Sequence, residues 1–317
     1  MGAFFHAVGV FFHHLSQVRW EPFAIALSCQ LVKLLFRARA WQNILRASYP
    51  HERIRYASTF GAYVAGVGVN SIAPARGGDL VKLYLVRRRA PETRYATLAS
   101  TLVVETMFDF VVAGALLVWA LSIGVLPTRQ VYSRIPTVDW KFFLRHDRWT
   151  VGGLLVLALV LLVLFVLAER RLDEWWKRIK LGFAILSDRR RFVLGVVVPQ
   201  AVSWVFRLAT LYFFLEAFRV HASVHNALLA QVVDSLATLF PATPGGAGTK
   251  QGLIVYLFHR SAISTSLLLA FSVGMNIAIT VENLVLGLAA IAVMARTLSF
   301  KRLRAASQEE RADESPA

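Results

Sequence analysis

The stretch FPATPGGAGTKQG (240–252) places two prolines, several glycines and a lysine inside an apolar part of the chain. Proline cannot donate a backbone hydrogen bond and glycine turns without steric cost, so a helix is expected to break here. An apolar arm from Asn226 to Phe240 precedes the break, and the arm after it has about 13 residues, or about 20 Å of helix. Because a membrane span needs about 30 Å, the stretch predicts a broken or re-entrant hairpin rather than two full spans.

A second segment, YASTFGAYVAGVGVNSIAPARGGDLVKLYLV (56–86), has the same plan. Its apolar arm runs to about Ala73 and is broken at Pro74 and by the glycines that follow. The arm from Gly77 to Arg88 gives about 18 Å of helix, again too short to cross. Because arginines flank both ends of the unit, we predict a second hairpin that opens on the basic side.

Outside these hairpins the chain is dominated by long apolar blocks. Of its 317 residues, 56% are hydrophobic and 17% are charged, whereas soluble domains carry about 25% charged residues. This composition predicts an all-α, polytopic helical membrane protein. The expected spans are residues 21–38, 95–126, 150–168, 195–219 and 262–295.

The distribution of Lys and Arg predicts how these spans are oriented. Placing the basic loop 37–55 in the cytoplasm follows the positive-inside rule and leaves the two hairpins opening on opposite sides. One membrane domain, 1–296, then has halves at about 21–126 and 195–295 linked by span 150–168, an inverted-topology repeat. We expect it in the cell (plasma) membrane, with residues 297–317 forming a disordered cytoplasmic tail.

The net charge of +16 is explained by basic clusters between apolar blocks, so we expect lipid partners and no nucleic acid. Cys29 is the only cysteine, so no intramolecular disulfide can form. The histidines have no ligand spacing, and we expect neither a metal nor another cofactor.

The two breaks are the predicted substrate site. A short helix that begins at a break points its positive end and free N–H groups inward, which suits an anion, and Arg76 and Lys250 add full charges. Pro/Gly breaks that serve only helix packing are the structural alternative. The predicted binding residues are Asn70, Pro74, Arg76, Gly77, Gly78, Asp79, Pro241, Thr243, Pro244, Gly245, Gly246, Gly248, Lys250 and Gln251.

Charged residues inside spans form a second set of candidates. Glu105 and Asp109 are four residues apart and share a helix face. They are predicted either to pair with Arg76 or Lys82, or to bind a coupling proton or cation. Asp234 and Glu282 lie near the second break and are better candidates for a functional, coupling role, with a structural role as the alternative. Lys33 and Glu216 are interpreted as span-end residues whose charged groups reach water.

These motifs carry a resemblance to a known family. NSIAPARGGDLVKLYLV (70–86), TLVVETMFD (101–109) and LFPATPGGAGTKQGLIVY (239–256) resemble the lysylphosphatidylglycerol synthase transmembrane-region family, from about residue 20 to 296. Two positions depart from the family pattern: Thr106, where Arg often follows the glutamate, and Gln251, where Glu is frequent. No segment outside the membrane region is long enough for the synthase domain, so the resemblance is to a stand-alone member.

The resemblance implies a flippase-like protein that moves lipids between leaflets. Members are linked with aminoacylated phospholipids, cardiolipin and isoprenoid-linked glycans. We therefore expect a transporter of an anionic phospholipid or an isoprenoid-phosphate-linked lipid, rather than an enzyme. Two alternatives stay open. One is a membrane-embedded transferase acting on a lipid phosphate, with Glu105, Asp109 or Asp234 as base or metal ligand. The other is a non-transporting partner of a lipid-modifying enzyme or glycosyltransferase.

Overall fold

The computed structural model describes residues 17–73, 77–122, 181–239, 248–258 and 263–313. Every regular element in these ranges is helical, as an all-α protein requires. The elements are α2 (Trp20–Ser48), α3 (Tyr56–Asn70), α4 (Gly77–Arg89), α5 (Tyr95–Ser122), a 3-10 turn η2 (Ala184–Ser187), α9 (Arg189–Phe192), a π-helical segment η3 (Val193–Val197), α10 (Val198–Ala217), α11 (Val224–Leu239), α12 (Thr249–Leu257) and α13 (Thr265–Asp313).

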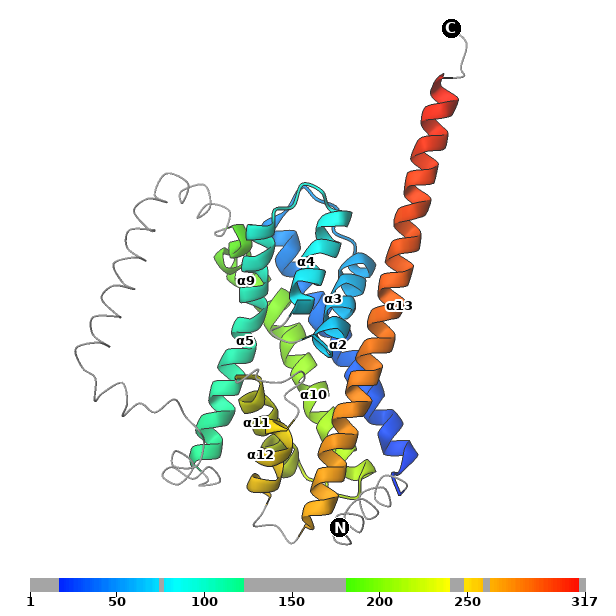
Figure 1. Ribbon diagram of the computed structural model, residues 1–317. Coiled ribbons are helices and arrows are strands. Elements are labelled where there is room, and N and C mark those ends of the chain that lie inside the picture. The colour runs from blue at the N-terminus through cyan, green and yellow to red at the C-terminus, as the bar shows by residue number, and fades with distance from the viewer. Residues whose placement is uncertain (1–16, 74–76, 123–180, 240–247, 259–262, 314–317) are drawn as a thin grey trace, which may run out of the picture.

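Two helices, α2 and α10, run antiparallel through the middle of the bundle (Figure 1). The Arg19 N–H donates to the carbonyl of Ala217 at 2.9 Å, and the rings of Phe36 and Phe206 stack with centroids 6.2 Å apart. At the other end, the side chain of Asn43 donates to the carbonyl of Gly195 at 2.8 Å. The contact of α2 with α10 therefore continues past the start of α10 into η3.

The remaining short helices form two hairpins that enter the bundle from opposite ends (Figure 1). Hairpin 1 is α3 with α4, and it opens at the end that carries the α2–α3 turn and α9, here named the basic end. Hairpin 2 is α11 with α12, and it opens at the opposite end. Their tips approach each other about halfway along α2 and α10. The short arms expected after each break are thus present as helices.

Glycines allow very close packing around hairpin 1. A side chain at Gly78 would collide with the carbonyl oxygen of Gly66, while the Gly78 N–H donates to the side-chain oxygen of Asn70 at 2.7 Å. On the other face of α3, a Cβ at Gly68 would lie 3.0 Å from the Cα of Gly287 on α13. Small residues that let helix backbones touch are typical of packing between membrane helices.

Each hairpin buries its own apolar cluster. Around hairpin 2 the buried side chains include Phe214, Phe258 and Phe271, from α10, the end of α12 and α13. Around hairpin 1 they include Trp41 and Leu98, from α2 and α5. Two separate cores leave the space between the hairpin tips to polar side chains.

The outer faces of the long helices are apolar. Three segments in the described chain are long and apolar enough to cross a membrane: Tyr95–Ala120, Arg189–Ala217 and Thr265–Arg296. Large hydrophobic side chains on these helices are exposed, as lipid contact requires. Examples are Phe110, Val111, Val118, Val205, Val285 and Leu288. The prediction of an all-α membrane protein is confirmed.

Several predicted boundaries differ from the structure. Residues 37–48 are not a loop, because α2 continues to Ser48, so that prediction was wrong. The cause is composition: Arg37 and Arg39 end the hydropathy signal, but Ala38, Ala40 and Trp41 between and after them are fully buried. Likewise α13 continues to Asp313, which differs from a disordered tail after 296, because Lys, Arg, Glu, Gln and Ala are good helix formers. Span 150–168 lies outside the described residues.

Candidate functional site

Arg37 joins α2 to both carboxylates of α5. Its Nη2 lies 2.9 Å from Glu105 Oε1 and 2.5 Å from Asp109 Oδ2, and its Nη1 donates to Asp109 Oδ1 at 2.9 Å. The four-residue spacing places both carboxylates on one face of α5, where a single guanidinium can reach them. The planar guanidinium of arginine can make bidentate contacts with carboxylates, whereas the ammonium group of lysine cannot.

The groups around this ion pair complete a buried network. The Tyr63 hydroxyl donates to Glu105 at 2.8 Å and accepts from Arg37 Nε at 2.8 Å. The Trp204 indole N–H donates to Asp109 at 2.8 Å. Lys82 on α4 stands over the Tyr63 ring, with its Nζ 4.1 Å from the centroid. The network thus ties α2, hairpin 1, α5 and α10 together.

Lys82 is the second cation of this group. Its Nζ lies 3.4 Å from Asp79 and 3.9 Å from Glu105, and its side chain is only 4% exposed. The pairing of Glu105 with Lys82 is therefore seen, although Arg37 makes the shorter contacts. We name Arg37, Lys82, Asp79, Glu105 and Asp109 the hairpin 1 cluster.

A second cluster holds the two arms of hairpin 2 together. Asp234 on α11 lies 2.5 Å from Lys250 on α12 and 2.5 Å from Arg207 on α10. Arg207 Nε also donates to the side-chain oxygen of Gln231 at 2.8 Å. We name Arg207, Asp234 and Lys250 the hairpin 2 cluster. Two cations share one carboxylate here, so this cluster carries an excess positive charge.

The start of α12 is capped by a side chain. Gly248 has φ 85°, a backbone conformation that glycine adopts without strain. Its N–H donates to the Gln251 side-chain oxygen at 2.6 Å. The expectation of a free N–H at this residue was therefore wrong. Gln251, one of the two departures from the family pattern, has a clear structural role as the cap of this helix.

A chain of amide hydrogen bonds links the tip of hairpin 1 to α2 and α13. Lys33 Nζ donates to Gln30 at 2.5 Å, and Gln30 donates to the side-chain oxygen of Asn283 at 3.2 Å. Asn283 in turn donates to Ser71 Oγ at 3.2 Å. Beside it, Asn70 donates to Asp79 at 3.2 Å. This chain, with Glu282 adjacent to Asn283, is the third polar group of the core.

The three groups together form one polar core. Its charged members in the described ranges are the cations Lys33, Arg37, Lys82, Arg207 and Lys250 and the carboxylates Asp79, Glu105, Asp109, Asp234 and Glu282. Trp204 joins the two clusters, because its N–H donates to Asp109 and its ring centroid lies 4.8 Å from the Arg207 guanidinium carbon. The hairpin 1 cluster has two cations against three carboxylates, whereas the hairpin 2 cluster has two against one. The core therefore has an excess of negative charge at hairpin 1 and an excess of positive charge at hairpin 2.

The structure brings some predicted residues together and leaves others undescribed. Asn70, Gly77, Gly78, Asp79, Gly248, Lys250, Gln251, Glu105, Asp109, Asp234 and Glu282 all lie at the hairpin tips or in the polar core. The remaining predicted residues fall outside the described ranges: Pro74, Arg76, Pro241, Thr243, Pro244, Gly245 and Gly246.

Sequence reasoning missed several members of the core. Arg37 was assigned to a loop, although the buried Ala38, Ala40 and Trp41 around it were a usable signal that the helix continues. Lys33 was assigned to a span end, but it lies inside the core and bonds to Gln30. Glu216 does lie at a helix end, where it pairs with Arg19 at 3.1 Å. Tyr63, Trp204 and Asn283 carried no signal of their own.

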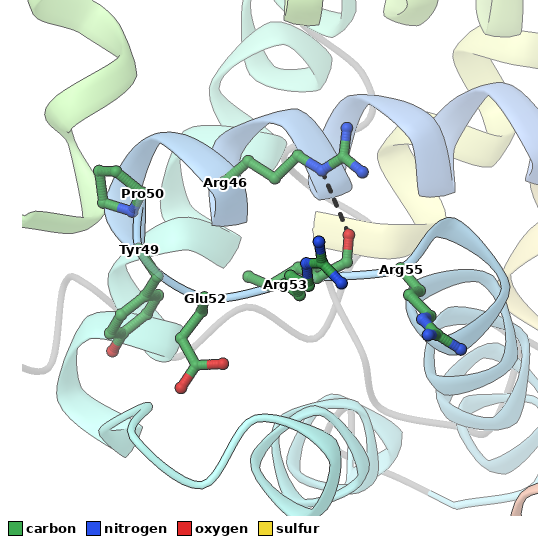
Figure 2. A pocket seen from close by; sticks show the side chains of 7 residues that line it. Arg46, Tyr49, Pro50, Glu52, Arg53 and Arg55 are labelled. Carbon is green, nitrogen blue, oxygen red and sulfur yellow. Dashed lines mark hydrogen bonds between the residues drawn. The ribbon is translucent and has the colours of Figure 1, made fainter.

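Two hollows mark the basic end. Figure 2 shows the first, of about 430 Å³, between the end of α2 and the start of α3, with Arg46, Arg53 and Arg55 around it. The Arg46 Nε donates to the carbonyl of Ile54 at 3.2 Å. The second hollow, of about 590 Å³, shares Arg46 and is bordered by Arg190 and Arg191. Arginines at one end of an apolar bundle suit a surface that meets anionic headgroups.

The fold and the polar core define a class: integral membrane proteins in which two broken helical hairpins meet inside an apolar bundle. The profile of the family described as "Lysylphosphatidylglycerol synthase TM region" matches residues 3–301. The chain belongs to this family.

Two curated relatives are archaeal membrane proteins. A UPF0104 membrane protein of Methanothermobacter thermautotrophicus is 24% identical, over 85% of this chain and 83% of its own length. A UPF0104 membrane protein of Methanocaldococcus jannaschii is 23% identical, over 62% of this chain and 82% of its own length. This family membership agrees with the resemblance in the hairpin motifs.

Proposed function

We propose that this protein moves a lipid with an anionic headgroup between the leaflets of the cell membrane. The observation that carries the proposal is the polar core, in which charged side chains from both hairpins meet about halfway along the bundle. Charged groups at such depth are costly and usually serve a substrate or ion path. Broken helices that end at the same depth are the arrangement expected of a transporter site.

The division between apolar and polar parts fits the chemistry of a lipid. The acyl chains can stay against the apolar outer faces, so only the headgroup needs a polar route. A phosphate leaving water needs cationic partners, because burying it unpaired costs many kcal/mol. The core supplies these partners from several helices at once.

We place the phosphate at the hairpin 2 cluster. Arg207 and Lys250 share Asp234, so a phosphate that approaches finds one cationic charge not yet neutralised. In the hairpin 1 cluster the carboxylates outnumber the cations, which disfavours an anion there. The predicted role of Arg76, the break cation of hairpin 1, remains part of the proposal.

The arginine-lined hollows at the basic end are proposed as the place where headgroups gather before entry. With the positive-inside rule, this end faces the cytoplasm and the α13 C-terminus lies on the same side. The core offers less to a transferase, because Glu105, Asp109 and Asp234 are held by arginine or lysine and are not available as bases.

The test is lipid movement in liposomes that contain the full chain, with fluorescent phosphatidylglycerol and with a polyprenyl phosphate. Arg207→Ala and Lys250→Ala are each expected to slow movement by about tenfold or more, since a charged hydrogen bond contributes about 1.5–3 kcal/mol. Arg88→Ala is the matched control, because Arg88 is exposed and bonds only to Tyr84 in the described chain.

Two results would contradict the proposal. Equal rates in wild type and both core variants would remove the hairpin 2 cluster as the site. No movement of either lipid by the wild-type protein would reject the translocase and favour the transferase or partner alternatives. A co-purifying enzyme, or covalent product from a lipid-phosphate donor, would then separate these two.

A further inference from the structure

Glu282 on α13 is unlike the other carboxylates of the polar core. Asp79, Glu105, Asp109 and Asp234 each have a cation within 4 Å. Glu282 has no such partner among the described residues, and its buried Oε2 accepts no hydrogen bond from them. An ionised carboxylate whose buried oxygen has neither a cation nor a hydrogen-bond donor is costly inside an apolar bundle. The geometry therefore corresponds to the neutral acid.

The cation that would stabilise ionised Glu282 is already nearby. Lys33 on α2 interacts electrostatically with Glu282, but its ammonium group is bonded to Gln30 at 2.5 Å. Gln30 holds Asn283, the next residue after Glu282, and Asn283 holds Ser71 at the tip of hairpin 1. Pairing with Glu282 would draw the Lys33 ammonium away from Gln30.

We propose that Glu282 is a proton-binding site that couples proton movement to lipid movement. The step is a simple ionisation. The Glu282 O–H bond breaks, the proton passes to water on the side to which the core is open, and the carboxylate keeps the electron pair. The carboxylate is then paired by the protonated Lys33 ammonium, which moves from Gln30 to Glu282. No other bond forms or breaks.

The ionisation has a structural consequence at hairpin 1. When Lys33 leaves Gln30, the amide side chain of Gln30 can rotate, and its bond to Asn283 is no longer fixed. Asn283 holds Ser71, so ionisation removes this polar link between α13 and the tip of hairpin 1, while the contact of Gly68 with Gly287 keeps α3 packed on α13. Reprotonation restores the chain. The two protonation states of one carboxyl group thus favour two arrangements of the hairpin tip, which is the requirement for coupling.

Each helix packed against α13 carries charged or titratable residues of the polar core. Lys33 and Arg37 come from α2, Tyr63 from α3, Arg207 from α10 and Lys250 from α12, the elements packed against α13. Asp234 on α11 also interacts with Lys33. Arg37 and Tyr63 are occupied by Glu105, and Lys250 and Arg207 by Asp234, which leaves Lys33 as the cation that can change partner.

The inference rests on the proposed function, and the experiment separates the two. The full chain is placed in liposomes with NBD-labelled phosphatidylglycerol, and valinomycin with equal K⁺ on both sides holds the membrane potential at zero. Dithionite bleaching of the outer leaflet measures the final leaflet ratio. For one proton per lipid, a pH gradient of one unit is expected to shift that ratio about tenfold, because it is a tenfold difference in proton activity.

Two variants identify the residue. Glu282→Gln copies the neutral acid in size and shape, so the protein should fold, and the leaflet ratio that it reaches should not respond to the gradient. Glu216→Gln is the matched control, because Glu216 lies at the end of α10 and pairs with Arg19. It should keep the full tenfold shift. Lys33→Gln should lose the shift, as Glu282→Gln does, because the ionised carboxylate then has no partner.

Each outcome decides the question. A wild-type protein that moves lipid with no gradient response, or a Glu282→Gln variant with the full response, overturns the coupling site and leaves the translocase standing. If the wild type moves no lipid, the infrared carbonyl band of a protonated carboxylic acid is measured in detergent at neutral pH. Loss of that band in Glu282→Gln, but not in Glu216→Gln, supports the proton site, and its absence from the wild type overturns it.

Discussion

Replacement of Arg37 by methionine is expected to destabilise the folded protein by about 3–5 kcal/mol, the usual cost of removing one partner from a buried ion pair. Arg37 is 11% exposed, and it holds Glu105 and Asp109, which are 3% and 25% exposed. Methionine keeps much of the side-chain volume but removes the charge. Glu105 would then keep the Tyr63 hydroxyl and, as its cation, only the more distant Lys82, and Asp109 would keep the Trp204 N–H but no cation. Thermal unfolding of the detergent-purified protein, followed by size-exclusion chromatography, measures the effect.

The cause of this loss can be isolated by a second variant. Glu105→Gln and Asp109→Asn, added to Arg37→Met, remove the uncompensated charges without changing the shape of the site. The triple variant is expected to recover much of the lost stability, since neutralising a buried pair as a whole costs far less than breaking it. If Arg37→Met alone is as stable as the wild type, the ion pair does not hold the core together.

Replacement of Gly78 by alanine is expected to prevent hairpin 1 from packing. The added Cβ would overlap the carbonyl oxygen of Gly66 and lie 2.8 Å from both the backbone N and the side-chain oxygen of Asn70. Backbone atoms of α3 cannot move aside as a flexible side chain can, so the hairpin must open. Overpacking of this kind costs about 1–3 kcal/mol or more. The measurement is the fraction of monodisperse protein after extraction, together with its unfolding temperature.

The adjacent glycine provides a matched control. A Cβ at Gly77 would meet only the Ala73 Cβ, at 3.6 Å, which is an ordinary contact. Gly77→Ala should therefore leave stability unchanged, or raise it slightly through better helix propensity. Equal behaviour of the two alanine variants would show that the α3–α4 contact is looser than described.

The two hairpins could be predicted because their signal is local. Proline and glycine break a helix through their own backbone chemistry, and the length of each apolar arm decides whether it can cross. The arms on both sides of each break lie where the pattern placed them, and the short arm at Gly77 begins at the predicted residue. The inverted repeat and the membrane sidedness remain predictions.

The polar core could be predicted only in part, because its pairings are not local. Glu105 and Asp109 were recognised by their spacing, but their main partner, Arg37, lies 68 and 72 positions away in the chain. From the sequence alone, an arginine beside a basic segment is assigned to a loop. Only the ion pair of Arg37 with α5 shows why this residue is buried. For the same reason Asp234 was recognised as unusual, but its two cations were not assigned to it.

The antiparallel contact of α2 with α10 restricts how the molecule can change shape. These helices are joined near both ends, by Arg19 with Ala217 and by Asn43 with Gly195, and the Phe36 and Phe206 rings stack between. They form a rigid unit, which we call the frame. The hairpins pack on this frame through the apolar clusters and the ion pairs described above, over shorter helices. If the core opens to either end, we therefore expect the hairpins to move and the frame to stay still.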